Sequence, residues 1–315
     1  MRAVVLGTDN HFRTVECAKP VPGPGEVAVR VSHAGVQWGD VLVRDGHFPI
    51  PRPFVPGFEA AGRITAVGDG VDPSRIGEPV IALVGGGGFA EVVLAPAALA
   101  IGAEGIDART AAAAGWVAPT AYDLINTITG VGPGDSVLIH AASGGVGTLA
   151  AQFAAAAGAR RIVGVVGNAD RADYARQFGY HRLLTREEFP GALDGESFDT
   201  ILDPVGGATR AANLAHLAPH GRLAVYGNIA TFEPVAVSTN DLLTNGQSVM
   251  MYNSNLLSRT HTARLAASTT SALAQVAAGL IRIDITAEYE LADVGTAIEN
   301  LATGATHGKS IIRIP

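Results

Sequence analysis

Short runs of alternating hydrophobic and polar residues fill the first third of the chain, and this alternation is typical of β-strands. Glycine and proline separate the runs, and four consecutive glycines occupy residues 85–88. We therefore expect a small, irregular β-rich domain in this part of the chain. The predicted strands are Gly25–Val31, Ala60–Val67, Glu78–Val84 and Phe89–Leu94.

The pattern becomes helical near residue 109. Arg109–Asn126 is rich in alanine, and Pro119 within it is expected to kink or interrupt the helix. From Ser136 onward, apolar runs alternate with helical stretches, which predicts a parallel sheet with helices on both faces. After Ser136–Gly147, the predicted strands are Ile162–Val166, Leu183–Leu184, Phe198–Leu202, Gly221–Tyr226, Ser248–Tyr252 and Lys309–Ile314, and the predicted helices are Thr148–Ala157, Ala169–Phe178, Ala208–Leu217 and Leu265–Ala278.

Ser136–Gly147, with the sequence SVLIHAASGGVG, carries the clearest chemical signal. An apolar strand runs into a turn of small residues, and a helix follows. Small residues let the backbone approach a dinucleotide pyrophosphate, and the N–H groups at the helix start face the anion. Alanine replaces the first glycine of the common fingerprint, and a tight turn that merely packs helix on strand is the alternative. The candidate pyrophosphate-binding residues are Ala142, Ser143, Gly144, Gly145, Val146 and Gly147.

Composition narrows the possible functions. With 315 residues and 48% hydrophobic content, two domains with sizeable cores are expected. The net charge of −7, without any lysine or arginine cluster, argues against a nucleic-acid partner. The single cysteine, Cys17, excludes an internal disulfide and fits a reducing, cytoplasmic setting. Residues 141–159 lack charge, but their glycines and strand–turn pattern favour a buried α/β unit over a membrane span.

Several further motifs accompany the glycine turn along nearly the whole chain. They are Gly23-Pro24-Gly25-Glu26-Val27, Gly35–Gly46, Pro56–Gly62, Asp203-Pro204-Val205-Gly206-Gly207 and Gly308-Lys309. Their order and spacing resemble the medium-chain dehydrogenase/reductase superfamily, and more narrowly its zinc-free quinone oxidoreductase and enoyl reductase branch. The resemblance implies a Rossmann domain with a doubly wound parallel sheet, and a GroES-like β-rich catalytic domain. We expect the catalytic domain at residues 1–121 and 257–315, the dinucleotide domain at 122–256, and the substrate in the cleft between them.

The resemblance also bears on metal binding. Zinc enzymes of this superfamily carry a Gly-His-Glu element, whose histidine binds the metal, and a cysteine in the preceding loop. This chain has Gly57-Phe58-Glu59 and a cysteine-free His33–Gly39 at those places. A catalytic zinc needs about three protein ligands, and His33 and His47 lack a recognisable third. We therefore expect no catalytic metal.

The residues after the second Rossmann strand indicate which nucleotide is bound. NAD-preferring sites place an acidic residue there, whereas this strand ends at Val166-Gly167-Asn168 and Arg171 follows. Similar reductases use a basic residue at this point for a 2′-phosphate, which a guanidinium suits. We expect NADPH, held by Gly167, Asn168 and Arg171, with Arg186 closing the pocket. The alternative is that both arginines are solvated surface residues.

By the same resemblance, turns at the carboxyl ends of two further strands line the nicotinamide and its ribose. Ordinary turn chemistry is the alternative explanation for their glycine and asparagine. The cofactor-binding residues implied here are Asp203, Gly206, Tyr226, Gly227 and Asn228, together with Lys309 of the C-terminal motif.

Reducing a carbon–carbon double bond beside a carbonyl requires a donor to the carbonyl oxygen and a source of a proton. Gln37 stands where similar quinone reductases often have asparagine, and its amide is a candidate donor. His47 is a candidate proton donor, because histidine titrates near neutral pH. Asp40 and Arg44 complete the candidate catalytic set, more as an ion pair that shapes the loop than as reacting groups. Solvated loop residues are the alternative for Gln37 and His47.

The substrate is expected to be a small molecule. Trp38, Leu42 and Phe48 favour a larger hydrophobic substrate, and Tyr252 with Asn253 is a further candidate contact. The sequence leaves three functions open: a quinone or enone reductase, a biosynthetic enoyl reductase or cyclase-like enzyme on a polyketide-type intermediate, and a non-catalytic NADPH-binding structural or sensing protein. An edge strand at residues 247–252 also predicts a homodimer.

Overall fold

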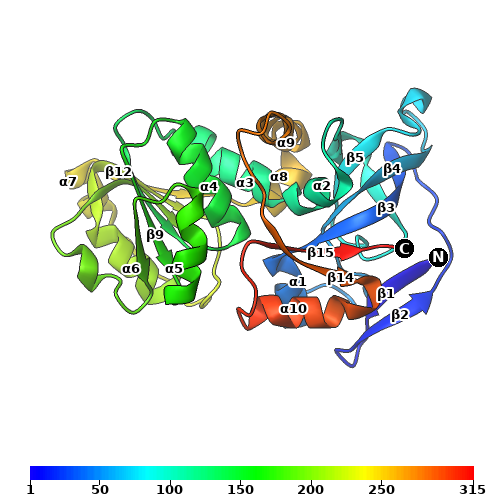
Figure 1. Cartoon of the computed structure of the whole chain (residues 1–315), viewed down its shortest axis with the longest axis horizontal. Coiled ribbons are helices and arrows are strands. Elements are labelled where there is room, and N and C mark those ends of the chain that lie inside the picture. Colours follow the sequence, from blue (N-terminus) through cyan, green and yellow to red (C-terminus); the bar gives the residue numbers. More distant parts are fainter. The chain divides into compact units, whose positions relative to one another are not determined.

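The computed structural model describes all 315 residues and divides the chain into two compact units (Figure 1). Unit 1 comprises residues 1–119 and 256–315, and unit 2 comprises residues 120–255. The second segment of unit 1 returns after unit 2 along the chain. Each unit is built around its own sheet.

Unit 2 contains the predicted parallel sheet. Its strand order is β10-β9-β8-β11-β12-β13, and every neighbouring pair is parallel. Helices α4 and α5 cover one face of this sheet, and α6 lies on the other (Figure 1). The doubly wound Rossmann arrangement is therefore confirmed. The strands are β8 (Ser136–His140), β9 (Arg161–Val166), β10 (Arg182–Thr185), β11 (Phe198–Asp203), β12 (Leu217–Val225) and β13 (Ser248–Met251), and the α-helices α4 (Gly145–Ala156), α5 (Ala169–Ala175), α6 (Gly207–Ala215) and α7 (Thr239–Asn245).

Unit 1 is built on a sheet of order β14-β15-β3-β4-β5-β7, with β6 paired to β3. The long strand β3 pairs antiparallel with β4 and with β15, so the C-terminal strand, red in Figure 1, lies beside the blue β3. Its strands are β1 (Arg2–Leu6), β2 (Phe12–Glu16), β3 (Glu26–Val36), β4 (Glu59–Val67), β5 (Pro79–Leu83), β6 (Val92–Pro96), β7 (Ala100–Gly102), β14 (Ile285–Glu290) and β15 (Lys309–Arg313). The helices are α1 (Trp38–Arg44), α2 (Ala108–Ala114), α3 (Val117–Tyr122), α8 (Ser254–Thr260), α9 (Thr262–Ala277) and α10 (Val294–Ala302). The boundaries between the two units fall within α3 and α8.

Most predicted strands and helices are confirmed, but several boundaries are wrong. Strand β3 continues to Val36 rather than ending at Val31, and β12 begins at Leu217 rather than Gly221. The helix after the glycine turn begins at Gly145 rather than Thr148. The last residues of the glycine-rich segment, 145–147, are already helical. The strand predicted at Phe89–Leu94 lies at Val92–Pro96, and only an isolated bridge from Ala90 pairs the preceding residues.

The alanine-rich helix is interrupted, but before Pro119. Helix α2 ends at Ala114, and α3 begins at Val117. The backbone N–H of Trp116 donates to Glu59 Oε2 at 2.6 Å instead of continuing the helix. Pro119 then falls in the first turn of α3, where a missing N–H costs nothing. A π-helix at Asp123–Ile128 follows α3.

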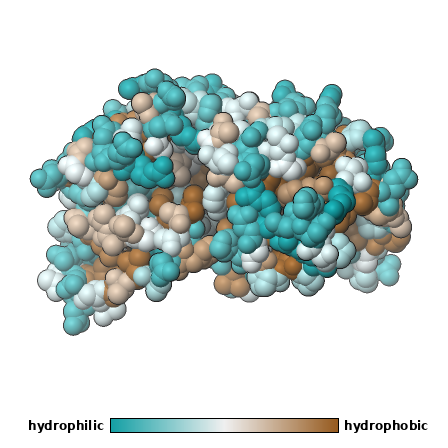
Figure 2. Space-filling view, turned by 90° about the horizontal axis from the view of Figure 1, so that it is seen from below, coloured by the Kyte–Doolittle hydropathy of each residue, from teal (hydrophilic) through white to brown (hydrophobic).

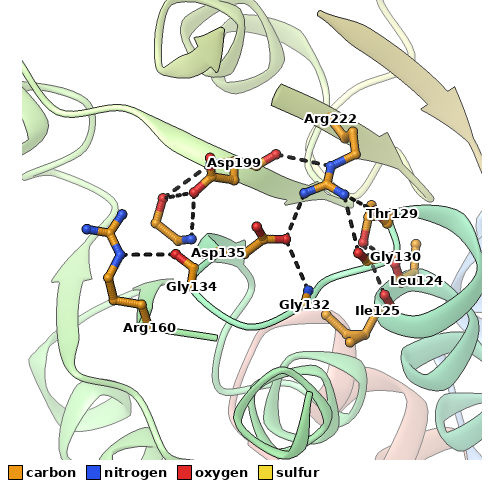
Figure 3. Close-up of polar contacts among 11 residues, drawn as sticks. Leu124, Ile125, Thr129, Gly130, Gly132, Gly134, Asp135, Arg160, Asp199 and Arg222 are labelled. Carbon is orange, nitrogen blue, oxygen red and sulfur yellow. Dashed lines mark hydrogen bonds and ion pairs between the residues drawn. The ribbon is translucent and has the colours of Figure 1, made fainter. Parts of the chain in front are cut away.

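A polar network closes the amino-terminal edge of the unit 2 sheet (Figure 3). Arg222 donates to the Asp135 carboxylate at 2.8 Å and to the backbone oxygens of Thr129 and Asp199. Asp199 in turn accepts from the backbone and hydroxyl of Ser136, the first residue of β8. These bonds satisfy polar groups at one edge of the sheet, whereas the carboxyl ends of the strands lie at the opposite edge, where ligands of such sheets bind.

The surface is chemically mixed. On the face shown in Figure 2, hydrophobic residues form scattered patches among hydrophilic ones. Within this structure, no helix has the length and apolar character that crossing a membrane would require.

Candidate active site

The glycine turn joins β8 to α4 in a conformation that needs small residues. Ala141 has φ +53°, in the left-handed region that residues other than glycine rarely occupy. A Cβ on Gly147 would lie 2.5 Å from Ala141 O and 2.8 Å from Ala142 Cα, so only glycine fits there. Gly144 is the N-cap of α4, and the N–H groups of the first turn are left for a ligand. This cradle fits a dinucleotide pyrophosphate.

Arg171, predicted to bind the 2′-phosphate, lies beside the turn. Its guanidinium Nη1 donates to the buried Ser143 Oγ at 3.3 Å, joining the first turn of α5 to the glycine turn. Burial lowers the pKa of Arg171, and the positive charge of Arg186 lowers that pKa further. Two guanidiniums near enough to repel each other favour an anion between them.

The other two residues predicted near β9 shape this region. Asn168 Oδ1 accepts the backbone N–H of Arg171 at 3.1 Å and so caps α5. Gly167 is exposed next to the Arg171 side chain. Asn168 therefore positions the helix start that carries Arg171, a role that the sequence prediction did not include.

Asp203 was predicted to contact the cofactor, and the structure corrects this. Its carboxylate is fully buried and accepts the backbone N–H groups of Val205 at 2.6 Å and Gly206 at 3.1 Å. Arg210 Nε donates to it at 2.8 Å. Because its oxygens are taken within the fold, Asp203 shapes the turn after β11 instead of facing a ligand. Gly206 has φ +88°, which explains why this turn needs glycine.

Sequence reasoning missed Arg210 altogether. Besides Asp203, its guanidinium donates to Asn228 Oδ1 at 3.0 Å and to Gly227 O at 2.7 Å. It thereby ties the turn after β11 to the turn after β12, the two turns assigned to the nicotinamide side. The only sequence signal was an arginine in the first turn of the helix that follows a strand-end aspartate.

The two tyrosines near the carboxyl edge differ in role. Tyr226 is partly buried beside Asp203, and burial, followed by the negative charge of that carboxylate, raises the pKa of its hydroxyl. Tyr252 was predicted to contact substrate, but it is buried and donates its hydroxyl to the equally buried Asp123 Oδ2 at 2.9 Å. That bond anchors the end of β13 to the π-helix, so the substrate assignment for Tyr252 is corrected. Asn253, the next residue, is exposed.

In unit 1, the predicted ion pair between Asp40 and Arg44 does not form. Asp40 is buried at the start of α1, where Oδ2 accepts the N–H of Gln37 and Oδ1 accepts the N–H of Gly57, both at 3.0 Å. Arg44 instead pairs with Asp45 at 2.8 Å and with Glu299 at 2.6 Å. The N–H of Gln37 at the N-cap of α1 and the N–H of Gly57 before β4 hold the Asp40 carboxylate, so that it does not pair with Arg44.

The remaining candidates of this segment are spread over the surface and the core. His47 is exposed in the loop that follows α1. Phe48 lines an open hollow of about 370 Å³ together with Arg44 and Arg52. Trp38 packs against the core of unit 1, where its indole N–H is buried, and Leu42 is partly buried. The structure therefore gives Trp38 a packing role besides any contact with substrate.

Lys309 was assigned to the cofactor, but its ammonium is buried inside unit 1. It donates to Glu59 Oε1 and to Val36 O, at 2.5 and 2.9 Å. Glu59 Oε2 accepts the Trp116 N–H, so this carboxylate joins β4, β15 and the break between α2 and α3. The lysine is thus the partner of a buried acid inside unit 1.

The same contacts decide whether the Gly57-Phe58-Glu59 segment could bind a zinc ion. Phe58 has no donor atom, and the carboxylates of Asp40 and Glu59 are occupied by N–H groups and by Lys309. The structure brings together no group of three or more histidine, cysteine, aspartate or glutamate side chains suited to a metal ion. These residues do not fit a zinc ion.

The burial of Asp40 predicts a pH-dependent stability. Burial, reinforced by the negative charge of Glu59, raises the pKa of Asp40 to about 7, although two backbone hydrogen bonds and Lys309 oppose this. Since the folded protein then holds a proton that the unfolded chain releases near pH 4, this contribution to stability is lost as the pH rises from about 4 to about 7. We expect Asp40→Asn to lack this contribution of up to about 4 kcal/mol.

Denaturant unfolding of both proteins between pH 4 and 8 measures the difference. The free energy of the wild type relative to Asp40→Asn should fall across this range. A constant difference between the two proteins would show that Asp40 is ionised throughout.

Comparison with known proteins agrees with these two units. Residues 23–104 match the Alcohol dehydrogenase GroES-like domain family, and residues 145–268 match the Zinc-binding dehydrogenase family. A quinone oxidoreductase of Pseudomonas aeruginosa is 32% identical over 92% of both chains, and one of Salmonella typhimurium is 30% identical over 97% of this chain and 96% of its own. The chain belongs to the quinone oxidoreductase group of the medium-chain dehydrogenase/reductase superfamily. The resemblance inferred from the motifs is confirmed.

Solved structures of this group have the same fold. The Escherichia coli quinone oxidoreductase complexed with NADPH has a TM-score of 0.89 at 26% identity, covering 99% of this chain and 100% of that one. A mycobacterial protein complexed with NADPH has a TM-score of 0.90 at 28% identity, covering 99% of both chains. A mycocerosic acid synthase-like polyketide synthase of Mycobacterium tuberculosis is also 30% identical over 98% of this chain, which spans 15% of that much longer protein.

Proposed function

We propose that this protein is an NADPH-dependent, zinc-independent reductase that transfers hydride to a quinone or an α,β-unsaturated carbonyl compound. The contact between Arg171 and Ser143 carries the proposal, because it places a guanidinium beside the phosphate-binding turn where a 2′-phosphate would be recognised. The quinone oxidoreductases among its relatives, and the NADPH bound in two similar structures, support it.

Each part of the candidate site would have its own role in the reduction. Bound NADPH supplies a hydride. The first turn of α4 would hold its pyrophosphate, and Arg171 with Arg186 its 2′-phosphate. The turns that Arg210 ties together would support the nicotinamide ribose. In unit 1, Gln37 would donate to the substrate oxygen and His47 would supply a proton.

The test is a fluorescence titration with NADPH and NADH, followed by addition of 9,10-phenanthrenequinone or a simple enone to the tighter complex. The proposal expects tighter binding of NADPH and oxidation that depends on the acceptor. Binding without oxidation of any acceptor would favour a non-catalytic role. Binding of neither nucleotide would overturn the proposal.

Arg171→Leu should reverse the nucleotide preference. A charged hydrogen bond to phosphate contributes about 1.5–3 kcal/mol, so the Kd for NADPH should rise by roughly 10–100-fold. The Kd for NADH should change little, because NADH lacks the 2′-phosphate. Arg176→Leu, which removes an exposed arginine paired with Asp173, is the matched control. Equal losses for NADPH and NADH would place Arg171 outside the 2′-phosphate site.

A biosynthetic enoyl reductase is the second candidate. It is favoured by the polyketide synthases, of which this chain matches a segment. A panel of quinones, enones and enoyl thioesters separates the two candidates, because a biosynthetic enzyme should reduce a thioester far faster than a quinone.

We also propose that the protein is a homodimer that pairs through β13. This strand lies at the edge of the unit 2 sheet, and Met251 at its end is 69% exposed. An edge strand with an apolar end invites pairing with a second copy. Light scattering that gives the mass of a single chain would contradict this proposal.

A further inference from the structure

One tyrosine outside the glycine motif reaches into the phosphate-binding turn. Tyr180 stands between Gly179, which ends the helical segment after α5 in a left-handed conformation, and β10. Its hydroxyl donates to Gly147 O at 2.8 Å and lies 3.3 Å from Ala142 O. These two carbonyls belong to the two ends of the turn. A single side chain from another segment therefore contacts both ends of the turn.

The absence of a side chain at Gly164 of β9 leaves room for the Tyr180 ring. A Cβ on Gly164 of β9 would lie 2.7 Å from Tyr180 Cε1, so the strand must have glycine opposite the tyrosine. The ring also packs against the small apolar cluster that contains Ala142 and Ala172. Burial, followed by the effect of Tyr226, raises the pKa of the Tyr180 hydroxyl, which keeps it protonated as a donor.

The backbone at the start of this turn has a conformation that neighbouring groups must hold in place. Ala141 begins the turn with φ +53°, a conformation that costs a residue with a side chain roughly 1–3 kcal/mol and persists only where the surroundings hold it. The bridged carbonyls lie one residue and six residues beyond Ala141. A hydroxyl that donates to Gly147 O and lies against Ala142 O restrains the backbone between them, and with it the direction of the N–H groups at the start of α4.

We propose that Tyr180 is a positioning residue for cofactor binding, whose hydroxyl presets the turn from Ala142 to Gly147 for a dinucleotide pyrophosphate. This inference rests on the proposed function, in which that turn binds NADPH. Tyr180 touches no reacting atom, and its effect passes through the backbone carbonyls that it holds. Preorganisation of this kind lowers the cost of ordering the site when the ligand binds.

The experiment compares Tyr180→Phe with the wild type toward two ligands. NADPH uses the turn, whereas adenosine 2′-phosphate offers its phosphate to the Arg171 side and carries none for the turn. Loss of one net hydrogen bond should raise the Kd for NADPH about three- to tenfold. The Kd for adenosine 2′-phosphate, measured by calorimetry or NMR, should stay unchanged. The kcat at saturating NADPH should also be preserved, so that the effect falls on KM.

A matched control removes a tyrosine hydroxyl elsewhere. Tyr289 of β14 accepts one hydrogen bond, from Asn300 Nδ2 at 3.0 Å, in unit 1. Tyr289→Phe should change the binding of neither ligand. Thermal unfolding of both variants shows whether a general loss of stability accompanies the change in binding.

Two results would overturn the inference. One is an unchanged Kd for NADPH in Tyr180→Phe, and the other is an equal weakening of both ligands, which would indicate a general structural role. These results differ from failure of the proposed function, in which the wild type itself would bind no NADPH or would show no effect of Arg171→Leu.

Discussion

Glu59→Gln is expected to lower the free energy of unfolding of unit 1 by about 3–5 kcal/mol. Glu59 is fully buried and pairs with Lys309, whose side chain is 5% exposed. Glutamine leaves the ammonium without a counter-charge, and its NH2 group cannot accept the N–H of Trp116 if its oxygen faces the lysine. An uncompensated buried charge is among the largest penalties that one substitution can impose.

Two further variants distinguish the effect of losing the buried ion pair from the effect of losing a charge in general. Glu299→Gln breaks the exposed pair with Arg44 and should cost about 1 kcal/mol or less, because solvent screens such pairs. The double variant Glu59→Gln/Lys309→Met should recover much of the lost stability, since an apolar side chain needs no counter-charge. Denaturant unfolding monitored by tryptophan fluorescence compares the three. A Glu59→Gln protein as stable as the wild type would mean that Lys309 is satisfied by other groups.

The Rossmann unit was predictable because its signals are local. Each buried parallel strand is a short apolar run, and β8, β9 and β11 lie within a residue or so of their predicted positions. Gly147 and Arg171 also follow from local patterns, a strand–turn–helix layout and the missing acid after β9. Such signals need no knowledge of distant contacts.

The errors arise where a distant partner decides the outcome. Lys309 was assigned to the cofactor through the resemblance, but its ammonium pairs with Glu59, which lies 250 positions away in the sequence. Asp40 looked like a partner for Arg44, but the buried N–H of Gly57 takes its carboxylate. From the sequence alone, the interaction of Asp40 with Arg44, four residues away, cannot be compared with its interaction with Gly57, because only the fold brings Gly57 near.

The same reasoning explains the residues that were missed. Arg210 and Tyr180 act on backbone carbonyls, and a backbone acceptor leaves no signature in the sequence. Gly164 carried the one available hint, because glycine inside a buried strand often marks a close approach by another group. Its neighbour in space is Tyr180.

Gly147→Ala is expected to raise the Kd for NADPH at least ~100-fold, equivalent to about 2.7 kcal/mol. The new methyl group would lie 2.5 Å from Ala141 O and 2.8 Å from Ala142 Cα, and both of these atoms are backbone. Neither can turn aside as a flexible side chain could, so the turn and the first turn of α4 must separate. That movement displaces the N–H groups that would face the pyrophosphate.

A second glycine distinguishes this clash from the general effect of alanine. Gly132 lies in the loop before β8, and a Cβ there would meet nothing within 4 Å. Gly132→Ala should therefore bind NADPH like the wild type, and both variants should still unfold cooperatively when heated. Gly147→Ala with unchanged NADPH affinity would contradict the assignment of this turn to the pyrophosphate. If it bound neither NADPH nor adenosine 2′-phosphate, the damage would extend to the Arg171 side, because Ser143 of the same turn accepts the Arg171 hydrogen bond.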